Sequence, residues 1–270
     1  MMHVLSQMYM FVVKYIKTSL LKNKRLVFSC LCVGLFAFWI TYEYTGLYYI
    51  FIQKKKIEPE NVNGIIQDYS GECASYFSAA FNEKYEVGLM RFGEGVVCVS
   101  ALGSFDDVDV KYLRTATEIL NKAIGEEKFE VVDYSIINTN ISVIYLPLPQ
   151  IGNEPFGKCS KLLNSFTNEI KFASIYIYKI EQINFRKRVV MHELLHAIGF
   201  GGHPPSLFDK TFLTDKNLNP DIYTDSLLFF EAEAIKMLYD KRLPNHLTRE
   251  MYIEQVTMSP LKKSINIMNF

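Results

Sequence analysis

The sequence has no excess of charge of either sign and lacks several common functional motifs. Acidic and basic residues number 29 each, and this balance gives no sign of a nucleic-acid partner. The chain contains no internal repeat, no low-complexity tract, no phosphate-cradling glycine loop and no CxxC motif. These absences argue against a repeat architecture and against a metal site built from cysteine thiolates.

The length and composition indicate a folded protein. The chain has 270 residues, enough for one sizeable hydrophobic core or two small ones. Hydrophobic residues make up 49% of it, and 17 tyrosines and 20 phenylalanines argue against disorder.

The N-terminal fifth of the chain is unlike the rest. Residues 26–42 carry no charge, and a charge-free run of this length is rare in soluble proteins. Glu43 interrupts the run, which then continues to about residue 52. Several aromatic residues resemble an interfacial belt, namely Trp39, Tyr42, Tyr44, Tyr48 and Tyr49. The sequence therefore predicts one transmembrane anchor over residues 26–52, with the lipid bilayer as its partner.

The charges that flank this span predict its orientation. Five basic residues precede it and three lysines, Lys54 to Lys56, follow it. The excess favours a cytoplasmic segment 1–25 and a C-terminal domain in the periplasm or outside the cell. A cleaved signal peptide fits less well, because no small-x-small site ends the apolar region.

The cysteines bear on the redox environment of the part of the chain that follows the predicted span. Three of the five lie beyond the predicted span, at Cys73, Cys98 and Cys159. An odd count allows one disulfide with one thiol left over, and the sequence does not choose the pair.

Residues 53–88 are expected to form a linker and an N-terminal helix, and residues 89–270 a catalytic domain. Strands are expected at 96–104, 129–134, 141–147 and 172–180, helices at 106–125, 188–199, 225–243 and 248–256, and a loop at 147–160. This order predicts an α/β (α+β) fold with one mixed, mostly parallel sheet.

The stretch "HELLHAIGFGGH", residues 192–203, carries the strongest functional signal. At about 100° per residue, His192 and His196 point together from one side of a helix, with Glu193 beside them. Two imidazoles on a rigid helix suit zinc, and the glutamate can act as a general base towards a water activated by that zinc. Gly199 ends the helix, so the chain can turn back and bring His203 to the same ion.

At these residues the chain resembles the metzincin zinc metallopeptidases, whose signature is HExxHxxGxxH. His192, Glu193, His196 and Gly199 stand in register, but Gly202 occupies the third ligand position and His203 follows it. The resemblance implies a zincin-like fold, a catalytic Zn²⁺ held by three histidines, and peptide or protein substrates.

A looser resemblance covers most of residues 70–245. It is to uncharacterised bacterial envelope proteins with a metzincin-related domain, through "LMRFGEGVVCVS", "NISVIYLP", "ASIYIY" and "EAIKMLYDKRL". Metzincins also place a methionine turn beneath the metal. Here Phe208 stands near the corresponding position. Either Phe208 replaces the methionine beneath the metal, or the turn is absent.

Two other hypotheses compete with that of a membrane-anchored zinc peptidase. A gluzincin-like enzyme would take its third ligand from a downstream glutamate, Glu231 or Glu233. A zinc-bound envelope scaffold would use the same fold without catalysis. In the peptidase reading, strand 172–180 would offer an edge to an extended peptide, and Phe208 and Phe212 would line the opposing wall.

Overall fold

A computed structural model describes residues 59–81, 88–133, 139–147, 156–204, 208, 210–214, 226–245 and 247–258. The predicted cytoplasmic segment 1–25 and the predicted span 26–52 lie outside the described residues. No helix in the described part of the chain is both long enough and apolar enough to cross a membrane. The described residues all belong to one unit, residues 53–270.

The described part of the chain contains both helices and strands. The helices are α3 (Pro59–Gln67), α4 (Gly71–Phe77), the 3-10 turn η1 (Ser78–Ala80), α5 (Asp107–Ile124), α6 (Ile183–Ile198), α7 (Phe229–Leu238) and α8 (Arg249–Met258). The strands are β1 (Arg91–Phe92), β2 (Val97–Gly103), β3 (Phe129–Val131), β4 (Ile141–Leu146), β5 (Gly157–Leu163) and β6 (Glu169–Tyr178).

Within the described residues the strands form one mostly parallel sheet. The order is β1-β6-β4-β2-β3, with every neighbouring pair parallel, and β5 pairs with β6 in the antiparallel direction. The expectation of an α/β fold with a mixed, mostly parallel sheet is therefore confirmed.

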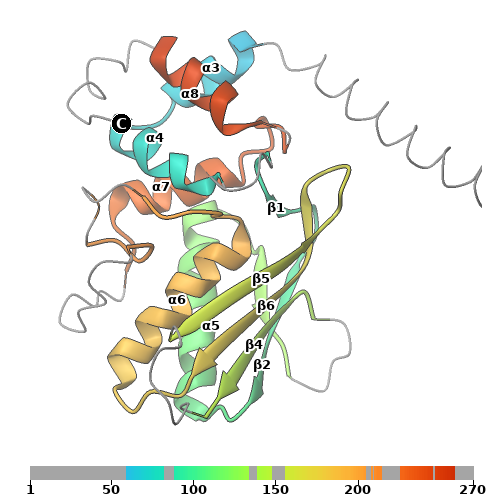
Figure 1. Cartoon of the computed structure of the whole chain (residues 1–270), viewed down its shortest axis with the longest axis vertical. Helices are drawn as coiled ribbons and strands as arrows, with labels where there is room; N and C mark the ends of the chain where they lie inside the picture. The colour runs from blue at the N-terminus through green and yellow to red at the C-terminus, as the bar shows by residue number, and fades with distance from the viewer. Residues whose placement is uncertain are drawn as a thin grey trace, which may run out of the picture. The chain divides into compact units, whose positions relative to one another are not determined.

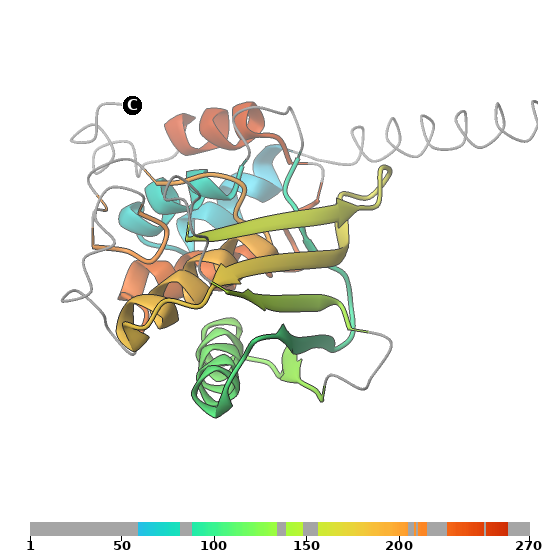
Figure 2. The ribbon, with the colours of Figure 1, turned by 60° about the horizontal axis from the view of Figure 1, so that its bottom comes forward.

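Helices α5 and α6 pack against this sheet (Figures 1 and 2). Helix α6 contacts β5 and β6, while α5 contacts β2 and β3. Val99, Val143 and Ile175, on three neighbouring strands, are fully buried, whereas Phe172 and Tyr176 are each 37% exposed on the other face. A second group of helices, with α3 against α8 and α4 against α7, completes the same core.

The ends of α5 and α6 follow from their sequences. Asp106 and Asp109 form a capping box at the start of α5, and Gly125 ends that helix at φ 86°. Gly199 ends α6 at φ 145°, where a Cβ atom would lie 2.1 Å from the carbonyl oxygen of Met90. Only glycine fits there, so the chain leaves α6 abruptly just before His203.

The predicted loop at 147–160 is partly wrong, because β5 begins at Gly157. This edge strand alternates half-buried and exposed residues, with Lys158, Ser160 and Leu162 on the exposed side. Its lysines and serine hide the strand pattern from a reading based on apolar alternation. The expected peptide-binding edge is wrong as well, since β6 pairs with β4 on one side and β5 on the other.

The cysteine expectation is also corrected. Cys73, Cys98 and Cys159 are all free thiols, so no disulfide forms among the described cysteines. Cys73 is buried in α4, whereas Cys98 and Cys159 lie on β2 and β5.

Candidate metal centre

Three histidines converge at the C-terminal end of α6. The Nε2 atom of His203 lies 3.2 Å from Nε2 of His196 and 3.3 Å from Nε2 of His192. His192 is 9% exposed, His196 is half-buried, and His203 is exposed. The three residues are therefore close enough to hold one metal ion.

The glycines before His203 bring it back to the helix. The N–H of Gly201 donates to the carbonyl of Ala80 over 3.1 Å, and that of Gly202 donates to Ala79 over 2.8 Å. A Cβ atom at Gly202 would lie 3.2 Å from the carbonyl oxygen of Phe81, a tight approach. Contact with the η1 region thus places His203 at the cluster even though it stands one residue later than in the metzincin signature.

The spacing of the nitrogens fits a tetrahedral metal. Zinc–nitrogen bonds are about 2.0–2.1 Å, and the corners of a tetrahedron with such bonds lie roughly 3.3 Å apart. The separations of His203 Nε2 from those of His196 and His192, 3.2 and 3.3 Å, agree with this value, and the ligand atoms of all three histidines lie within 4.8 Å of one another. The donor set therefore fits zinc on ligand type, and His203 fits it on its distances to the other two histidines.

Backbone carbonyls hold the two helical histidines. Nδ1 of His192 lies 2.7 Å from the carbonyl oxygen of Phe212, and Nδ1 of His196 lies 2.9 Å from that of Phe200. A carbonyl only accepts, so each Nδ1 carries the proton and each Nε2 offers a lone pair. Burial, then the neighbouring His192, holds the pKa of His196 well below its ordinary value and favours this neutral form.

Glu193 is a residue of α6, and its side chain lies beside the edge strand β5. It is 7% exposed. A Cβ atom at Gly157 would lie 2.7 Å from both Cγ and Oε1 of Glu193. The absence of a side chain at Gly157 therefore makes room for the Glu193 carboxylate beside the edge strand.

Lys161 is a polar residue next to the candidate metal centre that the sequence did not predict. Its Nζ atom on β5 donates to the carbonyl of His196 over 2.8 Å and to that of Phe200 over 3.3 Å. Burial lowers the pKa of this ammonium group. A cation at these carbonyls complements the C-terminus of α6. No pattern around Lys161 in the sequence distinguishes it from a solvent-facing strand lysine.

The downstream glutamates do not join the cluster. Glu231 is 1% exposed and accepts hydrogen bonds through both oxygens from Tyr76, Phe212 and Leu228. Glu233 accepts a 2.5 Å hydrogen bond from the hydroxyl of Ser70. The expected glutamate ligand of a gluzincin-like site is therefore not observed among the described residues.

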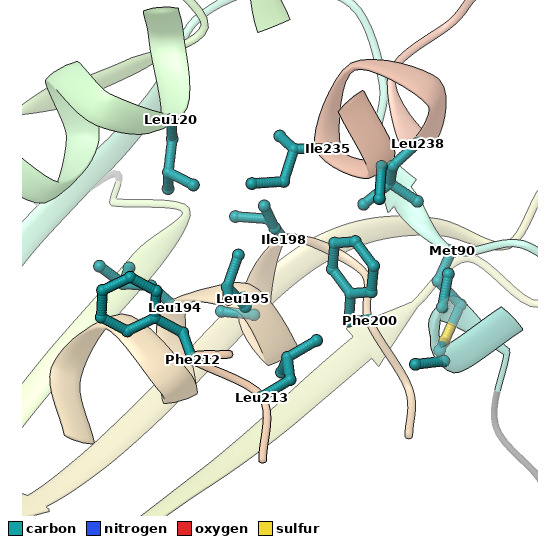
Figure 3. Close-up of a cluster of buried hydrophobic side chains, with 14 of the residues drawn as sticks. Met90, Leu120, Leu194, Leu195, Ile198, Phe200, Phe212, Leu213, Ile235 and Leu238 are labelled. Atoms are coloured by element: carbon teal, nitrogen blue, oxygen red, sulfur yellow. The ribbon is translucent and has the colours of Figure 1, made fainter. Parts of the chain in front are cut away.

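Phe208 and Phe212 are core residues and not free pocket linings, which corrects the expected wall. They are 6% and 3% exposed, and Phe208 packs against Tyr76 at 5.5 Å between ring centroids. Figure 3 shows the ring of Phe212 beside Leu194 in this core. The backbone carbonyl of Phe212 lies next to the first histidine.

Fold and site together define an α/β protein with a three-histidine candidate metal centre at the C-terminal end of the helix that follows β6. No protein-family model matches the chain, and no curated protein is similar enough in sequence to serve as a relative. The argument for function therefore depends on the site itself.

Proposed function

We propose that this chain is a membrane-anchored zinc metallopeptidase of metzincin-like type that hydrolyses peptide bonds outside the cytoplasm. The main support is the convergence of three histidines at the end of a helix that also carries Glu193: Nε2 of His203 lies 3.2 and 3.3 Å from those of His196 and His192, and the ligand atoms of all three lie within 4.8 Å of one another. His192, His196 and His203 would hold the ion. Zinc bound there would supply a lowered water pKa and polarisation of a substrate carbonyl.

Glu193 is the proposed general base. It follows His192 directly on α6, and its carboxylate lies beside β5, where a Cβ atom at Gly157 would come within 2.7 Å of Oε1. A carboxylate in this position takes a proton from the attacking water and passes it to the leaving amine nitrogen. Because Glu193 is not a ligand, it remains available for both transfers.

The edge strand β5 is the proposed docking strand for an extended peptide. Among the described strands it pairs with β6 alone, and its residues next to α6 include Gly157 and Lys161. A peptide pairing with the other side of β5 would run past Glu193 and the histidines. This replaces strand 172–180 as the proposed lip of the cleft.

The membrane part of the proposal is supported by residues 26–52 alone. Their charge-free core and aromatic flank favour a single anchor, with residues 1–25 in the cytoplasm. The catalytic domain would then be periplasmic or extracellular.

Metal dependence tests the proposal. Purified full-length chain should contain one zinc and degrade an unstructured protein such as casein. Chelation should abolish cleavage, and added zinc should restore it. A variant with both His192→Ala and His196→Ala should neither bind zinc nor cleave. A folded chain that binds no zinc, or cleavage that resists chelation, would contradict the proposal.

A further inference from the structure

Glu231 is a buried carboxylate close to the candidate metal centre without being one of its ligands. It lies in the first turn of α7, 1% exposed. An isolated buried carboxylate is costly, so its partners indicate what it does. Burial raises its pKa, while hydrogen bonds from the N–H groups of Leu228 and Phe212 act in the opposite direction.

One of these partners connects Glu231 to the metal centre. Oε1 of Glu231 accepts from the N–H of Phe212 over 2.8 Å and from the hydroxyl of Tyr76 over 3.2 Å. Oε2 accepts from the N–H of Leu228 over 2.9 Å. The carbonyl of the same Phe212 lies 2.7 Å from Nδ1 of His192. A single residue therefore links Glu231 to the first metal-binding histidine.

A second buried charge holds this segment from the opposite side. Arg188 lies on α6, one turn before His192, and is 1% exposed. Its guanidinium donates to the carbonyl of Thr211 over 2.8 Å. The backbone of Thr211 and Phe212 is thus held by hydrogen bonds from α6 through Arg188 and from α7 through Glu231.

We propose that Glu231 is a positioning residue for His192: it fixes the Phe212 backbone whose carbonyl sets the tautomer and ring orientation of that histidine. The inference rests on the proposed zinc site and names a residue that acts through a ligand. Hydrogen bonds to the second nitrogen of a ligating histidine typically change metal affinity 10- to 100-fold when they are lost.

The test is the zinc affinity of the full-length chain, measured by competition with a chromogenic chelator. Glu231→Gln replaces one carboxylate oxygen with an NH2 group that cannot accept, so the single remaining oxygen cannot serve the N–H groups of Phe212 and Leu228 as the two carboxylate oxygens do. We expect it to weaken zinc binding 10- to 100-fold. Glu233→Gln is the matched control, because Glu233 lies on the same helix and contacts Ser70 instead. It should leave zinc affinity unchanged. Circular dichroism verifies that each variant is folded.

A double-mutant cycle separates positioning from a general loss of packing. In a His192→Ala background, Glu231→Gln should have no further effect, because the ligand through which it acts is gone. In a His203→Ala background it should still weaken binding. If the 10- to 100-fold loss persists without His192, the inference is overturned.

A milder variant covers the case in which Glu231→Gln does not fold. Tyr76→Phe removes one donor to Oε1 and keeps the ring that packs on Phe200, Phe208 and Phe230. It should weaken zinc binding by a smaller factor in the same direction. Unchanged affinity in the folded variants overturns the inference alone, whereas a parent chain that binds no zinc overturns the proposed function with it.

Discussion

At the scale of single residues, His203 tests whether the metal centre has three protein ligands. Its Nε2 atom lies within 3.3 Å of those of both helical histidines. We expect His203→Ala to weaken zinc binding by more than about 100-fold, beyond the range of residues that only support a ligand. Competition with a chelator measures this.

His246→Ala is the matched control for His203→Ala, since it removes a histidine outside residues 192–203. It should bind zinc as tightly as the parent chain. Equal affinity of His203→Ala and the parent would exclude His203 as a ligand.

Gly157 tests the placement of the Glu193 carboxylate. A Cβ atom there would lie 2.7 Å from Glu193 and equally close to Val189, so Gly157→Ala must displace a side chain or the strand. We expect kcat for peptide cleavage to fall while zinc content stays at one ion, because the three heavy atoms nearest to a Cβ at Gly157 belong to Glu193 and Val189 and not to a histidine. Metal analysis and steady-state kinetics on one preparation measure both.

Gly64→Ala controls for the glycine substitution itself. Gly64 lies in α3, and a Cβ atom there would meet no other atom within 4 Å, so alanine should keep kcat and raise helix stability by about 0.5–1 kcal/mol. Unchanged kcat in Gly157→Ala would show that Glu193 is not held by this contact.

At the scale of elements, the sequence predicts the strongly patterned pieces and misses the weakly patterned ones. α5 is predicted well because Asp106 caps it and Gly125 ends it, both local signals. Strand β4 is similarly clear from its apolar run. Strand β5 is missed because an edge strand with outward lysine and serine has no apolar alternation, and only its pairing with β6 defines it.

The candidate site likewise contains residues that the local sequence predicts and residues that only tertiary contacts bring together. His192, Glu193 and His196 are predictable because helical spacing fixes their neighbourhood within two turns. The return of His203 depends on contacts of Gly201 and Gly202 with η1, more than a hundred residues earlier in the chain. The roles of Glu231 and Lys161 depend on tertiary contacts from α7 and β5, which no local pattern encodes.

At the scale of the whole molecule, zinc should stabilise the folded chain. The three candidate ligands come from α6 and from the segment after it, so unfolding destroys the site. At a zinc concentration 100 times the dissociation constant, linkage gives about 2.7 kcal/mol. We expect a rise in melting temperature of roughly 5–10 °C. A similar rise in the His192→Ala, His196→Ala double variant would indicate zinc binding elsewhere.

The predicted anchor also belongs to this scale. If residues 26–52 span the membrane with the N-terminus inside, protease added to intact spheroplasts should remove the C-terminal domain. Immunoblotting with antibodies against each end detects the products. Full protection of the C-terminal domain until the membrane is lysed would contradict this orientation.

The most direct test of the account is peptide cleavage by zinc-loaded parent chain and by Glu193→Gln, each incubated with an unbiased peptide library and analysed by mass spectrometry. Glutamine keeps the size of the side chain but cannot take the proton from water, so zinc content should stay at one ion. Turnover should fall about 10²- to 10⁴-fold. If the loaded parent cleaves no peptide, or if Glu193→Gln cleaves as fast as the parent, the peptidase account is contradicted and a zinc-bound scaffold is favoured.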